Sequence, residues 1–309
     1  MNYIKETGYF KSNNQYSQIA YYIYKPFNEP KAIFQISHGM CEYIERYEPF
    51  INFLASHDIL VCGNDHLGHK NSADCKENLG YFSFSDGWKC LVKDLVSMTK
   101  IIKKQYPNIP IFLFGHSMGS FVARFYITKY SHLIDGAIIC GTSGSNPLIG
   151  FGQLITTFVK KLKGDFYRSK LIQYFMFGTY NSKYKNVKTT HDWLTRDNSI
   201  INNFLKDEYC TFIFTASAFH DLVMLLKVVS SKNWYNAVPK NLPIYLISGD
   251  MDPVGNWGKG MKEVKRKLEK KNLEDFSSKL YKDFRHEILN EIDKEVVYKD
   301  ILTWLNQRI

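Results

Sequence analysis

A serine stands between two glycines in the segment Gly115-His116-Ser117-Met118-Gly119, which fits the pattern G-x-S-x-G. Chance alone produces this pattern in about one chain in ten of this length, because glycine and serine are common residues. The surroundings are more specific, since the apolar run 109–115 precedes the serine and a helix-like segment, 120–130, follows it. A tight turn between a buried strand and a helix lifts a serine hydroxyl above the sheet. We therefore predict that Ser117 is a catalytic nucleophile.

A serine hydroxyl needs a general base, and the base needs a carboxylate that orients it. After a turn of this kind the three residues are expected in the order serine, acid, histidine. His220 and His286 are the only histidines in the last third of the chain, and His220 precedes the apolar run 242–249 that carries the acids. His286 follows in the right order, so we predict it as the base. Asp250 and Asp252 compete for the role of the acid, and the sequence pattern favours neither.

The tetrahedral intermediate of such a reaction carries a negative oxygen, which needs hydrogen-bond donors. One donor is expected to be the backbone N–H of Met118, directly after the nucleophile. A second is expected on a loop after an early strand, and Met40 lies there, behind His38 and Gly39. Because glycine lets a backbone approach its neighbours closely, Gly39 suits such a loop. We predict Met40 and Met118 as the two donors, and His38 as a residue that shapes the loop.

Two kinds of element must position these residues. Apolar runs of strand length alternate with longer segments that have apolar residues at three- and four-residue spacing, which is typical of helices. The expected strands are 32–39, 59–65, 109–115, 135–141, 242–249 and 277–284, and the expected helices are 47–58, 86–106, 120–130, 257–272 and 294–309. This alternation predicts an α/β fold with a mostly parallel central sheet and helices on both faces. Asp86 is the expected N-cap of the second helix.

The alternation stops near residue 142, where "GTSGSNPLIGFG" has the composition of a loop. The segments that follow are helical, basic and aromatic up to about residue 210. We therefore expect a core formed by 1–142 and 211–309, interrupted by a mainly helical cap at 143–210. The apolar side chains of 154–180 have three interpretations: they line an acyl tunnel, they lie against a lipid surface, or they pack on the core.

The net charge of +10 comes from two segments, 143–210 and 259–271, which each carry a net charge of +5. The second is expected to be the solvated face of a helix, and the first favours peripheral contact with an anionic membrane surface. No nucleic-acid-binding motif accompanies the charge, so no nucleic-acid partner is expected.

The six cysteines form no C-x-x-C pair and have no zinc-site spacing, so no metal is expected. The first residues lack the basic and apolar regions of a secretory signal, which favours a cytoplasmic protein with free thiols. No run of 18 apolar residues occurs that would span a membrane. The proposed chemistry requires no cofactor.

Several of these segments together resemble the monoacylglycerol lipase-like branch of the α/β-hydrolase superfamily, many of whose bacterial members are labelled lysophospholipases. "HGMCEYIERY" (38–47) is similar to the oxyanion loop of that branch, and "GHSMGSFVAR" (115–124) to its nucleophile turn. The remaining similar segments are 65–72, 191–222, 248–260 and 284–291. The resemblance thus extends through most of the chain. It implies the α/β-hydrolase fold with an inserted cap.

The resemblance also implies that Asp252, rather than Asp250, orients His286, and it supports Met40 and Met118 as oxyanion donors. The implied reaction is hydrolysis of a carboxylic ester through an acyl-enzyme, with a small acyl ester or lipid as substrate. Monoacylglycerols and lysophospholipids lead the candidate substrates.

Other carboxylic esters, thioesters and acyl transfer use the same residues, and a non-enzymatic binding protein is disfavoured because every catalytic position is filled. An Asp-nucleophile dehalogenase or epoxide hydrolase is disfavoured by Ser117. Two positions depart from the family pattern: Tyr43 stands where a histidine is frequent, and Lys70 where glycine is frequent.

Overall fold

One sheet of eight strands runs through the protein in a computed structural model that describes residues 1–309. The spatial order of the strands is β1-β2-β4-β3-β5-β6-β7-β8. The strands are β1 (Tyr3–Lys11), β2 (Gln18–Pro26), β3 (Ala32–Ser37), β4 (Ile59–Asn64), β5 (Ile111–His116), β6 (Gly136–Cys140), β7 (Ile244–Gly249) and β8 (Phe276–Tyr281). Antiparallel pairing joins β1 to β2 and β2 to β4, and every other pairing is parallel.

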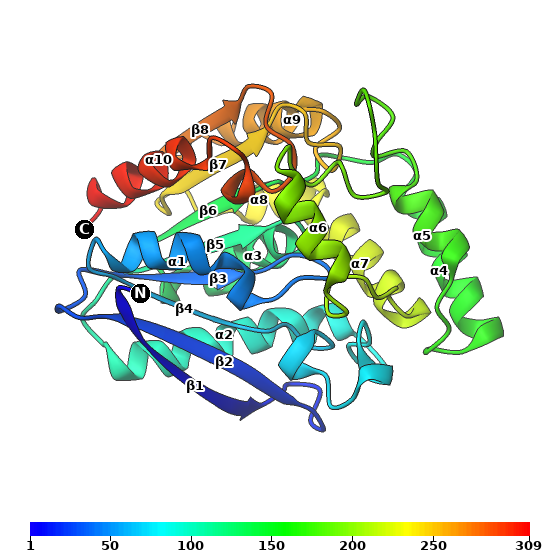
Figure 1. The fold of residues 1–309 in the computed structure, drawn as a ribbon, viewed down its shortest axis with the longest axis horizontal. Coiled ribbons are helices and arrows are strands. Elements are labelled where there is room, and N and C mark those ends of the chain that lie inside the picture. The colour runs from blue at the N-terminus through cyan, green and yellow to red at the C-terminus, as the bar shows by residue number, and fades with distance from the viewer.

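Helices cover both faces of this sheet (Figure 1). They are α1 (Glu48–Ala55), α2 (Gly87–Gln105), α3 (Met118–Tyr130), α4 (Ile149–Lys163), α5 (Lys170–Phe177), α6 (Asn198–Lys206), α7 (Ala216–Val229), α8 (Lys232–Ala237), α9 (Lys259–Glu269) and α10 (Lys294–Asn306). Side chains of α1 and α10 share one apolar core, and side chains of α2, α3, α7, α8 and α9 share the other. No helix combines the length and the apolar character that crossing a membrane requires.

The central strands contribute to both cores because neighbouring side chains of a strand point to opposite faces. Phe112 and Phe114 of β5 lie in the core with α1 and α10, whereas Leu113 lies in the core with α2 and α3. All six residues of β5 are buried, and so are those of β3, β4 and β7. This two-sided burial explains why these strands are continuous apolar runs rather than alternating ones.

The predicted α/β-hydrolase fold is confirmed, and the predicted elements agree with the structure to within a few residues at their ends. The N-terminal hairpin of β1 and β2 was not predicted, and neither was α7 as a core helix. Asp86 does precede α2, but its side chain caps no helical N–H. Its carboxylate instead contacts Lys89 Nζ at 3.0 Å, and the backbone of Asp86 is left-handed (φ 52°).

Helices α4, α5 and α6 lie between β6 and β7 in the chain, and α4 and α5 project to one side of the sheet (Figure 1). We propose that residues 143–210 form a cap on a core made of 1–142 and 211–309. The helix α7, which follows the proposed boundary, supports this division because Phe219 and Leu225 are fully buried in the core.

Candidate active site

Ser117 lies between the end of β5 and the start of α3, with its backbone at φ 53° and ψ −120°. A non-glycine residue in this region is strained, and such strain is typical of a functional turn. The two flanking glycines permit the turn. A Cβ on Gly119 would lie 2.0 Å from the carbonyl oxygen of Ser37, and one on Gly115 would lie 2.5 Å from the carbonyl oxygen of Gly119.

Replacing Gly119 by alanine should lower the free energy of unfolding by about 3 kcal/mol, because backbone atoms of β3 cannot move away from the added methyl group. Urea denaturation measures this change. Gly150→Ala in α4 is the matched control, since no atom lies within 4 Å of the added Cβ. The control should be as stable as the wild type or more stable by up to about 1 kcal/mol, from its better helix propensity. Equal stability of the two variants would contradict the tight turn.

His286 and Asp252 are joined by a hydrogen bond of 2.9 Å between His286 Nδ1 and Asp252 Oδ1. Asp252 is fully buried, and only 2% of His286 is exposed. Asp252 also accepts a hydrogen bond from the backbone N–H of Val254 at 2.9 Å, which fixes the carboxylate. Asp250 points elsewhere and accepts from the backbone N–H of Asp283 at 2.7 Å. Of the two acids, Asp252 is therefore the one that can orient the imidazole.

Ser117 and His286 line the same cavity, together with Gly39 and Met40. The Ser117 hydroxyl makes no hydrogen bond to His286 in this structure. Catalytic hydrogen bonds of ligand-free enzymes are frequently long and tighten when substrate binds. His220 lies outside this cavity, in α7, and contacts Thr156 Oγ1 at 3.2 Å.

The loop after β3 lies against the nucleophile. A Cβ on Gly39 would be 3.0 Å from Ser117 Cβ, so only glycine lets the loop come this close. The backbone N–H of Met40 has no hydrogen-bond partner within the protein. Met118 is the first residue of α3, where backbone N–H groups have no partner in the helix. Both predicted donors are thus free to bind an anionic oxygen near Ser117.

Three buried histidines support this loop. His38 Nδ1 contacts the carbonyl oxygen of Gly39 at 2.8 Å, and His38 Nε2 accepts from the backbone N–H of His66 at 2.8 Å. His69 Nε2 accepts from the backbone N–H of Cys41 at 3.3 Å. Burial lowers the pKa of His38 to about 4 and that of His69 to about 3, so both are neutral near pH 7. They act as hydrogen-bonding supports of the loop.

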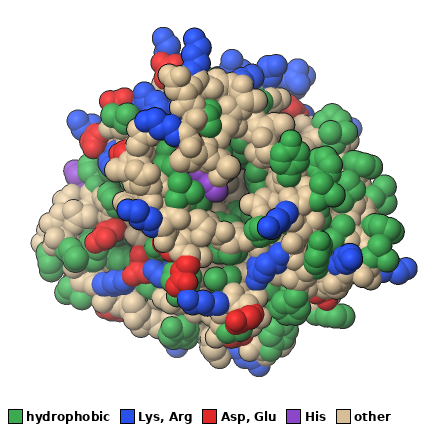
Figure 2. All heavy atoms as spheres, turned by 45° about the vertical axis from the view of Figure 1, so that its right-hand side comes forward, with side chains coloured by type: hydrophobic (Ala, Val, Ile, Leu, Met, Phe, Trp, Pro, Cys, Tyr) green, Lys and Arg blue, Asp and Glu red, His purple; other side chains and the backbone are tan.

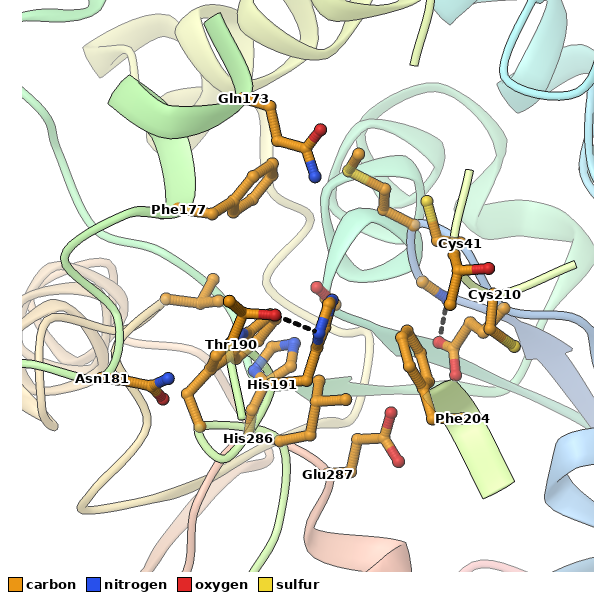
Figure 3. Close-up of a pocket in the computed structure, with 18 of the residues that line it drawn as sticks. Cys41, Gln173, Phe177, Asn181, Thr190, His191, Phe204, Cys210, His286 and Glu287 are labelled. Atoms are coloured by element: carbon orange, nitrogen blue, oxygen red, sulfur yellow. Dashed lines mark hydrogen bonds between the residues drawn. The ribbon is translucent and has the colours of Figure 1, made fainter. Parts of the chain in front are cut away.

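The cavity has a volume of about 380 Å³, which lies within the usual range of small-molecule sites. In Figure 3, His286 and Glu287 lie on one side of it, and Gln173 and Phe177 of α5 lie on the opposite side. Apolar side chains and polar ones such as Asn181 and His191 both line it. This mixture suits a ligand with an apolar part and a polar part.

Three residues of the cavity lining, Glu42, His116 and Glu287, form a mostly buried group with Arg46, and the sequence pattern assigned a role to none of the four. Arg46 donates two hydrogen bonds of 3.0 Å to the carboxylate of Glu287 and one of 3.2 Å to Glu42. His116 Nδ1 contacts Glu42 Oε1 at 2.9 Å. Glu42 and Arg46 are four residues apart in the 38–47 segment and Glu287 follows His286 directly, but nothing in the sequence indicates that these residues meet.

Tyr43 and Lys70, the two residues that depart from the family pattern, contact each other. Lys70 Nζ lies 3.7 Å from the centre of the Tyr43 ring and pairs with the carboxylate of Glu45. The Tyr43 hydroxyl donates to Asp207 Oδ2 at 2.6 Å. Lys70 has a φ of 35°, which explains why glycine suits this position. The ion pair and the cation–π contact offset this strain in the present chain.

An apolar surface extends over α4 and α5. Figure 2 shows hydrophobic side chains gathered on this side of the molecule, with lysines and arginines nearby. The exposed side chains are Leu148, Phe151, Leu154, Phe158, Leu162, Phe166, Tyr167, Leu171, Tyr174 and Phe175, which we call the cap surface. Leu154 is 70% exposed and Phe158 is 63% exposed. The interpretation that 154–180 simply packs on the core is therefore wrong for these residues.

Comparisons with known proteins agree with this fold. The model of the family described as serine aminopeptidase, S33, matches residues 28–293. A monoglyceride lipase homolog of monkeypox virus is 25% identical over 97% of this chain and 98% of its own. Human monoglyceride lipase is 27% identical over 92% of this chain and 86% of its own. A carboxyl esterase from Bacillus coagulans, solved with glycerol, superposes with a TM-score of 0.92 at 28% identity and covers 98% of both chains.

The family model, the monoglyceride lipase relatives and the sheet identify an α/β-hydrolase of the monoacylglycerol lipase-like type. The chain belongs to the family described as serine aminopeptidase, S33.

Proposed function

We propose that the protein is a serine hydrolase that cleaves carboxylic esters through an acyl-enzyme, with Ser117 as nucleophile, His286 as base and Asp252 as the orienting acid. The observation that carries the proposal is the 2.9 Å contact of His286 with Asp252 in a cavity that Ser117 also lines. The strained backbone of Ser117 supports it further.

In the first step, His286 takes the proton of the Ser117 hydroxyl as the serine oxygen attacks the ester carbonyl. Because Nδ1 of His286 is bonded to Asp252, Nε2 is the nitrogen that receives the proton. The backbone N–H groups of Met40 and Met118 stabilise the negative oxygen of the tetrahedral intermediate. His286 then protonates the departing alcohol, which leaves an ester of Ser117. In the second half, His286 takes a proton from water as the water oxygen attacks the carbonyl carbon of this ester. His286 then gives that proton to Ser117 Oγ as the bond to the acyl group breaks and the acid is released.

The substrate class that we propose is the monoacylglycerols, with lysophospholipids as the next candidates. The mixed lining of the cavity supports an ester with an acyl chain and a polar headgroup. The similarity to human monoglyceride lipase and to a carboxyl esterase supports the same class. The test is a matrix of esters with fixed acyl chains and either glycerol, glycerophosphocholine or a thiol as leaving group. A higher kcat/KM for the thioesters than for both oxygen esters would contradict the proposal.

We also propose that the cap surface makes peripheral contact with an anionic membrane surface. Its apolar side chains adjoin Lys161, Lys163 and Lys170, which are exposed. Apolar side chains stabilise insertion into the lipid interface, and each nearby lysine adds about 1 kcal/mol of attraction to anionic lipids. The cytoplasmic location remains a prediction.

The double substitution Leu154→Glu with Phe158→Glu should weaken binding to phosphatidylserine-containing vesicles at least about tenfold, because it removes two apolar contacts and adds two negative charges. Cosedimentation with vesicles measures the change. Phe27→Glu is the control, since Phe27 is 69% exposed but follows β2, away from the cap surface. The proposal fails if all three proteins bind the vesicles equally or if none binds them.

A further inference from the structure

Both ring nitrogens of His116 face hydrogen-bond acceptors. Nδ1 lies 2.9 Å from the carboxylate of Glu42, and Nε2 lies 3.3 Å from the backbone carbonyl oxygen of His286. A neutral imidazole has only one N–H, so it can donate to one of these acceptors and must place a lone pair against the other. Only the imidazolium ion donates to both. The geometry therefore favours a proton on each nitrogen.

The charges around His116 also favour its imidazolium form. Glu42 and Glu287 are each 5% exposed, Arg46 is 11% exposed, and His116 is 7% exposed, counting side chains. With His116 protonated, this buried group holds two negative and two positive charges. With His116 neutral, it would hold an uncompensated negative charge, which is unfavourable away from water.

The groups that face His116 are Glu42, Glu287, Arg46, Tyr47, His38 and His286. Burial by itself lowers the pKa of His116, but the adjacent carboxylate of Glu42 outweighs burial and raises it above the usual value. Burial opposes ionisation of Glu42 as well, and His116 and Arg46 hold its pKa below the usual value. The positive charge of His116 and the negative charge of Glu42 thus stabilise each other.

The carboxylate of Glu42 links this imidazolium to the oxyanion loop. Glu42 Oε1 accepts from the backbone N–H of Gly39, from the Tyr47 hydroxyl at 2.8 Å and from His116. His116 in turn holds the carbonyl oxygen of His286, whose ring centre is 4.7 Å from its own. One continuous chain of hydrogen bonds therefore connects the loop that presents Met40 with the loop that presents the base.

We propose that His116 is a positioning residue, held as an imidazolium, that fixes the oxyanion loop and the His286 loop in register on either side of Ser117. The role rests on the proposed function, because it concerns the placement of His286 and of the N–H of Met40. A displacement of about 1 Å between reacting groups lowers a catalysed rate by about 100-fold, which is the reason such a residue matters.

The first test observes the proton directly in the unsubstituted chain. Selective ¹⁵N-histidine labelling and NMR distinguish an imidazolium, with two N–H groups, from either neutral tautomer. We expect His116 to show both N–H groups at about pH 7, and to show one in Glu42→Gln, which removes the negative charge. The same spectrum should appear in Ser117→Ala. A single neutral tautomer of His116 in the wild type at about pH 7 would overturn the proposal.

The second test separates positioning from a purely structural role. His116→Gln keeps one donor but no charge, so we expect kcat to fall by about 10- to 100-fold while KM changes by less than about threefold. The exposed His132 provides the control, because His132→Gln should retain wild-type kcat and KM. A folded His116→Gln enzyme with normal kcat and reduced thermal stability would show that His116 is structural only, and would contradict the proposal.

The two tests also separate this inference from the proposed function. If a fluorophosphonate fails to label Ser117 but the spectrum shows the His116 imidazolium, the proposed function is wrong and the charge assignment holds. If Ser117 is labelled and His116 is neutral, the proposed function stands and this inference is wrong.

Discussion

Ser117→Ala should lower kcat for ester hydrolysis by about 10⁶-fold, because it removes the hydroxyl that forms the acyl-enzyme. The loss should appear in kcat far more than in KM, since the cavity that binds the substrate is unchanged. The substitution removes one hydroxyl from a residue that is only partly buried, so the fold should remain intact. Stopped assays with a chromogenic ester, at enzyme concentrations high enough to detect residual turnover, measure the change.

The Ser117→Ala variant is expected to keep a small residual activity. The N–H groups of Met40 and Met118 and the bound substrate remain in the variant, so a rate about 10³-fold above that in water is compatible with the account. A folded Ser117→Ala protein that keeps more than about a tenth of wild-type kcat would contradict the role of Ser117 as nucleophile.

Asp252→Asn should lower kcat by about 10⁴-fold. The amide fits the space of the carboxylate, but it stabilises the wrong tautomer of His286 and cannot stabilise the imidazolium that forms during attack. Asp252 Oδ1 is 2.9 Å from His286 Nδ1, so replacing the carboxylate by an amide changes the hydrogen bond to the imidazole directly. Steady-state kinetics between about pH 6 and pH 9 measure it, since a changed tautomer alters the whole profile and not one limb only.

Asp250→Asn is the matched control for this substitution. Asp250 lies two residues before Asp252 and accepts from the backbone N–H of Asp283 at 2.7 Å, a hydrogen bond that an asparagine side chain can retain. Its kcat should stay within about threefold of the wild type. If instead Asp250→Asn is the more damaged of the two variants, the assignment of Asp252 as the orienting acid is wrong.

The central strands could be predicted from the sequence because the pattern that indicates each strand lies within its own residues. Strands β3, β4, β5 and β7 are covered on both faces, which makes them mostly apolar runs bounded by loop residues. The carboxyl ends of the parallel strands β5 and β7 then place the Ser117 turn and Asp252 at one edge of the sheet. Order along the chain was therefore enough to predict Ser117 and His286, whereas the choice of Asp252 over Asp250 came from the resemblance to the family.

Other features depend on contacts between distant parts of the chain. The strand β1 lies at the edge of the sheet, and its burial pattern is mostly exposed, so its sequence carries little of the apolar signal that marks a strand. The group of Glu42, His116 and Glu287 forms only when the loops that follow β3 and β8 meet the end of β5. No spacing in the sequence indicates such a meeting, which is why His116 had no assigned role before the fold was known.

The contacts of the cap surface also could not be predicted from the sequence. The periodicity of 154–180 indicates helices with an apolar face, but it does not indicate what that face contacts. Thr156 and Ile172 of these helices are buried, whereas Phe158 and Leu171 are exposed. The direction of the apolar face depends on how α4 and α5 dock on the core, and this orientation is tertiary information.

The most direct measurement of the central claim is covalent labelling of the intact protein by a fluorophosphonate, followed by mass spectrometry. The reagent phosphonylates a serine only when a base activates its hydroxyl and donors stabilise the adduct. The account predicts one adduct per chain, on Ser117, and none on Ser117→Ala under the same conditions. A folded wild-type protein that remains unlabelled, or that is labelled at another residue, would contradict it.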